Sequence, residues 1–138
     1  MLYITEEVVT QIHAHGERHY PEEGAGLIFG KYTDSGRTDE CVMEMKNSSQ
    51  PDSRHNRYHI EANDVLACEN HAENLAMAII GVFHSHPDHP AQPSDFDLAW
   101  ALPSFPTLLP AFALGKRCQV DLGGYRRRAV LLKKVYVL

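Results

Sequence analysis

Hydrophobic and polar positions follow two different periods along the first 86 residues, and each period predicts its own kind of element. Apolar residues at Val8, Val9 and Ile12 have helical spacing, which predicts a helix over 5–19 with Thr5 as its N-cap. The run 77-MAIIGVF-83 is short, apolar and partly β-branched, so it predicts a buried strand that continues to 86. The other expected elements are strands at 25–30, 40–46 and 57–60, a polar turn at 31–40, a loop at 47–56, and a helix from about 63 to 75 capped by Asn63.

Three prolines, at 87, 90 and 93, prevent the strand at 77–86 from continuing, so a loop is expected there. Ser94 then has the character of an N-cap and predicts a helix over 94–101. Further on, 118-CQVDLGGYRRRAVLL-132 predicts a hairpin around a two-glycine turn. Strands mixed with three helices indicate an α/β sandwich with a mixed sheet.

Composition and charge narrow the class of protein. A chain of 138 residues, 43% hydrophobic, fits one domain over 1–138 with one core. The net charge of −5 argues against nucleic acid as a partner, and the longest apolar run, 75–83, is too short to span a bilayer. No N-terminal signal is recognisable, and the cysteines at 41, 68 and 118 are odd in number and widely spaced. We therefore expect a cytoplasmic protein with free thiols, without a nucleic-acid or membrane partner.

Candidate chemistry lies in one stretch, 84-HSHPDHPAQPSDFD-97. Side chains two apart on a strand point to the same face, so His84 and His86 can reach one metal ion while Ser85 points away. Asp97 falls in the first turn of the helix expected after Ser94, where its carboxylate can reach back to the two imidazoles. Taken alone, Ser94-x-x-Asp97 is also a variant of the capping box.

A second histidine pair provides an internal comparison. His13 and His15 have the same spacing as His84 and His86, but they lie in the predicted helix over 5–19. Residues two apart on a helix do not share a face, so we expect His13 and His15 to be solvated.

An acidic pair upstream supplies a further carboxylate. Pro21-Glu22-Glu23 is followed by the small-residue stretch 24-GAGL-27. Two imidazoles, one aspartate and a separate glutamate are the components of a hydrolytic zinc site.

This arrangement resembles the JAMM, or MPN-plus, metalloprotease family, whose pattern is an upstream glutamate, then His-x-His, seven residues and Ser-x-x-Asp. The resemblance covers roughly residues 1–105 and is closest to short prokaryotic members. It implies a three-layer sandwich similar to cytidine deaminases, Zn²⁺ held by His84, His86 and Asp97, and catalytic roles for Glu23 as general base and Ser94 at the oxyanion. Residues 104–138 fit the family poorly: seven Lys or Arg stand against one acidic residue over 115–138, whereas 1–114 has six against seventeen.

The substrate follows from the resemblance alone. It implies hydrolysis of a peptide or isopeptide bond after the C-terminal Gly-Gly of a ubiquitin-like sulfur-carrier protein. Two alternatives stay open. One is a non-catalytic MPN scaffold, which would have no need of a complete ligand set. The other is a metal hydrolase of different specificity, similar to phage tail-assembly or RadC-like proteins.

Overall fold

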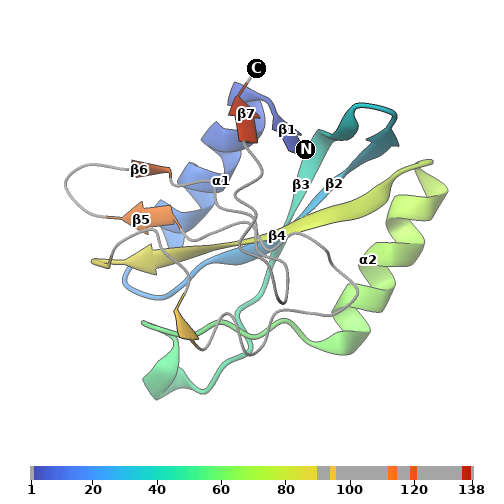
Figure 1. The fold of residues 1–138 in the computed structure, drawn as a ribbon. Coiled ribbons are helices and arrows are strands. Elements are labelled where there is room, and N and C mark those ends of the chain that lie inside the picture. Colours follow the sequence, from blue (N-terminus) through green and yellow to red (C-terminus); the bar gives the residue numbers. More distant parts are fainter. Residues whose placement is uncertain (1, 90–93, 96–111, 115–118, 121–134, 138) are drawn as a thin grey trace.

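The computed structural model describes residues 2–89, 94–95, 112–114, 119–120 and 135–137 (Figure 1). Among these residues no helix is both long enough and apolar enough to cross a membrane. The elements in chain order are β1 (Leu2–Ile4), α1 (Glu6–His19), β2 (Ala25–Thr33), β3 (Gly36–Met45), the short 3-10 helix η1 (Pro51–Ser53), α2 (Ala62–Asn74), β4 (Ala78–Pro87), β5 (Phe112–Leu114), β6 (Gln119–Val120) and β7 (Val135–Val137).

The strands of the described residues form one mixed sheet in the order β6-β5-β4-β2-β3-β1-β7. At its centre β2 pairs antiparallel with both β3 and β4, which are its neighbours on either side. Towards the edges, β1 runs parallel to β3 and to β7, and β5 runs parallel to β4. The sheet is therefore mixed, as the sequence predicted.

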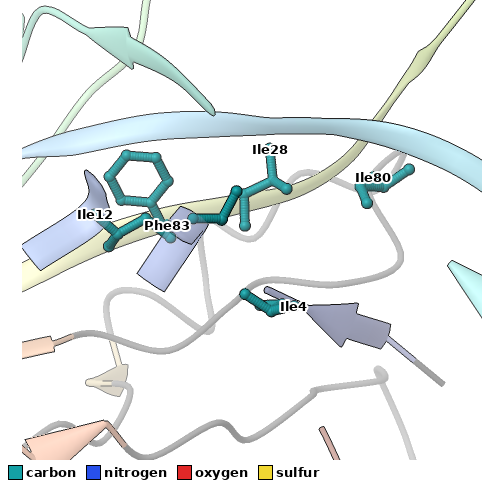
Figure 2. Packing of buried hydrophobic residues seen from close by; sticks show 6 residues of the cluster. Ile4, Ile12, Ile28, Ile80 and Phe83 are labelled. Carbon is teal, nitrogen blue, oxygen red and sulfur yellow. The ribbon is translucent and has the colours of Figure 1, made fainter. Parts of the chain in front are cut away.

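Helix α1 covers one face of the sheet. Its apolar side packs with residues of β1, β2 and β4 in a cluster shown in Figure 2. Phe83 fills the space above Gly26, where a Cβ would come within 2.4 Å of the ring. The buried members of this α1-side cluster are Ile4, Val8, Ile12, Ile28, Ile80 and Phe83.

Helix α2 packs against the opposite face, where a second cluster forms. Leu27 and Phe29 of β2 belong to it, whereas Ile28 between them belongs to the α1-side cluster, as the alternation of a strand requires. The buried members of this α2-side cluster are Leu27, Phe29, Met45, Ala72, Ile79 and Val82. The predicted three-layer α/β sandwich is therefore confirmed.

A β-bulge decides which face the end of β4 presents. Ile79 and Val82 both lie in the α2-side cluster although they are three residues apart, which strict alternation forbids. The pairing of β2 with β4 shifts between Ile28 and Phe29, so one extra residue of β4 is accommodated there. From Val82 onward every second residue of β4 faces α2.

The start of α1 is fixed as expected. Thr5 is its N-cap, and the Thr5 hydroxyl oxygen accepts a hydrogen bond from Val8 N at 3.3 Å. The buried Asp39 carboxylate accepts from both Thr5 N, at 3.0 Å, and Thr5 Oγ1, at 2.7 Å. This contact ties α1 to β3, and the negative charge of Asp39 suits the positive end of the helix dipole.

Several predicted boundaries are wrong. The polar segment 31–40 is not a turn as a whole: Lys31–Thr33 and Gly36–Glu40 lie in β2 and β3, because cross-strand pairing tolerates polar residues on exposed strand ends. Residues 57–60 form no strand, and β1 was not predicted. Helix α2 begins at Ala62 after Glu61, so Asn63 is not its cap.

Two predicted C-terminal elements fall largely outside the described residues. Of the helix expected over 94–101, only Ser94 and Asp95 are described, and Asp95 is helical. Of the expected hairpin over 118–132, only β6 is described, and it pairs antiparallel with β5.

His15 contradicts the expectation that it is solvated, because only 1% of its surface is exposed. Its ring packs edge-on against Phe83, at 5.7 Å between centroids, and beside His19 at 4.2 Å. A Cβ on Gly24 would lie 3.0 Å from His15 Cδ2, so the imidazole also fills the space behind Gly24. The helix periodicity was correct, but His15 falls on its buried side together with Val8 and Ile12.

Burial lowers the pKa of His15, and the neighbouring His19 acts in the same direction. Glu44, whose Oε2 lies 3.3 Å from His15 Nδ1, opposes this shift. Glu44 is itself paired with Arg18. The folded state therefore favours neutral His15 more strongly than the unfolded state does.

We predict that this histidine makes folding stability depend on pH below neutrality. A lowered folded-state pKa gives stability that is present above the ordinary value of 6.5 and is lost as pH falls below it. One proton accounts for at most about 1.4 kcal/mol per pH unit. Urea unfolding of the metal-free protein between about pH 7.5 and 5 should show this loss, and His15→Gln should reduce its slope, whereas exposed His71→Gln should not. Equal slopes for the parent and His15→Gln would contradict the assignment.

Candidate metal centre

His84 and His86 converge at the end of β4, as their spacing predicted. Their Nε2 atoms lie 3.1 Å apart, and the two rings are 4.9 Å apart between centroids. Both side chains are buried, with 0% and 7% of their surfaces exposed. At 3.1 Å the two nitrogens are within hydrogen-bond distance of each other, and two imidazoles that converge at one point are also a pair of donors suited to a metal ion.

Ser85, between the two histidines, points to the other side of the strand and holds β4 to the residues before β2. Gly24 N donates to Ser85 Oγ, and Ser85 N donates to Gly24 O, both at 2.8 Å. Ala25 pairs with His84 in the next position of the ladder. The same register places Glu23 across from His86.

Glu23 is buried beside the histidine pair, with 3% of its surface exposed. Its Oε1 lies 4.0 Å from His86 Nε2, a separation too long for a direct hydrogen bond. Glu22, its neighbour, is only half-buried, and its Oε1 lies 4.0 Å from Arg54 Nη1. The structure therefore places Glu23 rather than Glu22 at the histidines, which agrees with the register taken from the sequence motif.

The backbone of Glu23 is held by the loop at 46–61 rather than by the sheet. Glu23 N donates to Arg54 O at 2.6 Å, and Glu23 O accepts from Asn47 Nδ2 at 2.9 Å. The loop also provides Tyr58, whose ring stacks on His84 at 4.4 Å between centroids and 25° between planes. Sequence reasoning did not single out Asn47 or Tyr58. In the sequence, Asn47 is marked only by its position just after a strand, and Tyr58 only by His55 and His59 on either side of it.

The remaining predicted site residues are only partly described. Ser94 is exposed and directly precedes the helical Asp95, whereas Asp97 lies outside the described residues. Within the described part of the chain, no three His, Cys, Asp or Glu side chains form a group suited to a metal ion. His84 and His86 thus bring two imidazole nitrogens together, and Asp97, the third ligand expected from the sequence, lies outside the described residues.

The rim beside the histidines is polar. Tyr20 is 52% exposed, and its hydroxyl donates to Asp88 Oδ2 at 2.9 Å. This hydrogen bond raises the pKa of Tyr20. Asp88 and His89, which follow β4, are exposed.

The structure describes two of the three cysteines. Cys41 and Cys68 are free and half-buried, and burial raises the pKa of both thiols, which keeps them protonated and weakly reactive. Cys118 lies outside the described residues.

Comparison with solved structures identifies proteins of the same fold. The solution structure of a protein from Desulfitobacterium hafniense superimposes with a TM-score of 0.81 at 21% identity, covering 100% of this chain and 93% of that one. The solution structure of a protein from Salinibacter ruber is 30% identical, with a TM-score of 0.58 and coverage of 99% of both chains. No curated protein matches the chain.

The family comparison covers most of the sequence. Residues 5–128 match the Prok-JAB family, which is described as prokaryotic homologs of the JAB domain. This segment includes Glu23, the histidine pair, Ser94 and Asp97, and it extends into the region after residue 103 that resembles the JAMM pattern poorly. The chain therefore belongs to the Prok-JAB family of prokaryotic JAB-domain homologs.

Proposed function

We propose that this protein is a zinc-dependent peptidase that hydrolyses the peptide or isopeptide bond after the C-terminal Gly-Gly of a ubiquitin-like sulfur-carrier protein. One observation carries the metal-hydrolase part of the proposal, whereas the substrate rests on the family resemblance. Two buried imidazole Nε2 atoms converge to 3.1 Å, and the buried carboxylate of Glu23 lies 4.0 Å from one of them. A scaffold that only binds a partner has no need to bury these three groups together.

The donor set fits zinc. Zinc binds imidazole nitrogen at about 2.0–2.1 Å in tetrahedral geometry, which places two ligand nitrogens about 3.3 Å apart. The observed separation of 3.1 Å between the Nε2 atoms of His84 and His86 is close to this value. The residues that would hold zinc are His84 and His86, with Asp97 proposed as the third ligand.

Each residue near the site has a proposed task. When bound, zinc supplies Lewis acidity that polarises the scissile carbonyl and lowers the pKa of water to about 7. Glu23 takes a proton from the attacking water at its carboxylate and delivers it to the leaving amine. The Ser94 hydroxyl donates to the oxygen that becomes negative in the transition state. Tyr58 packs on His84 and restrains the orientation of that ring.

The site also explains why Glu23 suits this task. The Glu23 carboxylate lies 4.0 Å from His86 Nε2, which is too far for a direct hydrogen bond to that nitrogen. It is close enough for one water molecule to contact both groups. Because Glu23 and both histidines are buried, a water bound there would be shielded from bulk solvent, which would strengthen the charge interactions within the site.

We predict that Glu23→Gln and Glu22→Gln have very different effects on hydrolysis. Removal of the general base should lower kcat by roughly 10²–10⁴-fold while zinc content is kept, because only proton transfer is lost. Glu22→Gln is the matched control, since Glu22 is half-buried and faces Arg54, and it should stay within about threefold of the parent. Equal losses, or a loss from Glu22→Gln alone, would show that the wrong glutamate has been assigned.

We predict further that the substrate must end in two glycines before the scissile bond. Glycine has no Cβ, so an extended Gly-Gly tail can approach a buried site that bulkier residues cannot enter. The zinc-loaded protein should cleave carriers extended past Gly-Gly, as read by product mass, and should not act on casein. A bulky residue in place of either carrier glycine should abolish turnover. If no Gly-Gly fusion is cleaved by folded, zinc-loaded protein, the scaffold or a hydrolase of other specificity becomes the better account.

A further inference from the structure

We infer that Asn47 is a positioning residue that sets the place of Glu23 relative to the two histidines. The inference rests on the proposed function, because it gives Glu23 the role of general base. Asn47 follows β3 by two residues and does not belong to the metal-ligand pattern in the sequence. It is nevertheless buried, with 6% of its surface exposed, at the start of the loop at 46–61 that contacts the site.

The side-chain amide of Asn47 uses its full hydrogen-bonding capacity. Its Nδ2 donates to Glu23 O and to Arg57 O, both at 2.9 Å. Its Oδ1 accepts from Ser49 N at 3.0 Å and from His59 N at 3.2 Å. An amide group has two N–H donors and two acceptor lone pairs, so four backbone partners satisfy it completely.

These four bonds join two segments that are far apart in the sequence. Glu23 lies outside the β2 ladder, and its peptide is held by the bond from Asn47 and by the bond from Glu23 N to Arg54 O. Arg57 and His59 flank Tyr58, whose ring stacks on His84. A single buried amide therefore holds both the proposed general base and the aromatic ring that supports a metal ligand.

The energetic consequence concerns geometry more than binding. One buried hydrogen bond contributes modestly to stability, and a buried carbonyl left without a donor costs more than the bond itself contributes. For catalysis the displacement matters more, since an error of about 1 Å in a reacting group can lower the rate about 10²-fold. Loss of the Asn47 donor should therefore reduce kcat beyond any effect on folding.

The test uses Asn47→Asp, which separates the two halves of the amide. The new carboxylate keeps an oxygen to accept from Ser49 N and His59 N, but it cannot donate to the carbonyls of Glu23 and Arg57. Asn63→Asp is the matched control, because Asn63 is exposed in the first turn of α2, where an acid is tolerated. Both variants should keep the zinc content of the parent.

For Asn47→Asp we expect kcat per folded, zinc-loaded chain to fall about 10–100-fold with KM within about threefold. Backbone hydrogen exchange, which does not depend on zinc or activity, should accelerate at Glu23 N–H while Ser49 N–H stays protected. Asn63→Asp should match the parent in both measurements. Unchanged kcat, or unchanged exchange at Glu23, would overturn the inference, because a merely structural amide would alter unfolding alone.

A milder variant covers the case in which Asn47→Asp does not fold. Asn47→Ser in the parent and in the Glu23→Gln background forms a double-mutant cycle. If Asn47 positions Glu23, Asn47→Ser should slow the parent at least about tenfold and have almost no further effect once Glu23 is replaced. Additive losses would contradict this role. If the parent shows no hydrolysis that depends on Glu23, the proposed function fails, and exchange at Glu23 in the variants still decides whether Asn47 holds that peptide.

Discussion

The antiparallel pairing of β2 with β4 is the constraint on which the rest of the site depends. It brings Glu23 and the His84–His86 pair together from positions about sixty residues apart in the chain, and the two hydrogen bonds between Gly24 and Ser85 fix the register at that end. A slip of one residue would turn both imidazoles to the opposite face of the sheet, because side chains alternate along a strand. The register between β2 and β4 therefore determines the geometry of the site.

Burial makes this arrangement costly and informative. Glu23, His84 and His86 are nearly inaccessible to solvent, and polar groups in that position lose hydration that only partners can replace. The loop at 46–61 supports these residues in a different way: Asn47 and Arg54 hold the Glu23 peptide, and the Tyr58 ring stacks on His84. The loop at 46–61 is thus a structural part of the site, although it contributes no proposed ligand.

The sequence predicted the local parts of this account well. Strand spacing placed His84 and His86 on one face with Ser85 on the other, and helix periodicity gave α1 with its Thr5 cap. These predictions succeed because they rest on the geometry of a single element. The choice of Glu23 over Glu22 came from the family resemblance, and the pairing with β4 gives it a physical basis.

What the sequence did not predict depends on contacts between elements. The bulge opposite Ile28 and Phe29 determines that the histidines lie on the same face of the sheet as the α2-side cluster. No local sequence pattern predicts this bulge. His15 was expected to be solvated from its spacing to His13 alone. That spacing does not show which side of the helix is buried, and His15 in fact packs behind Gly24 and against Phe83. Asn47 gains its importance from four backbone partners distributed over the folded chain, which only tertiary structure brings together.

The most direct test of the central claim is X-ray absorption at the zinc edge, combined with elemental analysis of the purified protein. We predict about one zinc per chain with nitrogen and oxygen ligands at about 2.0–2.1 Å, imidazole among them. Zinc should be lost in His84→Ala and retained in His71→Ala, whose side chain is exposed on α2. Zinc bound through sulfur at about 2.3 Å, or retained when both His84 and His86 are replaced, would contradict the placement of the metal at the end of β4.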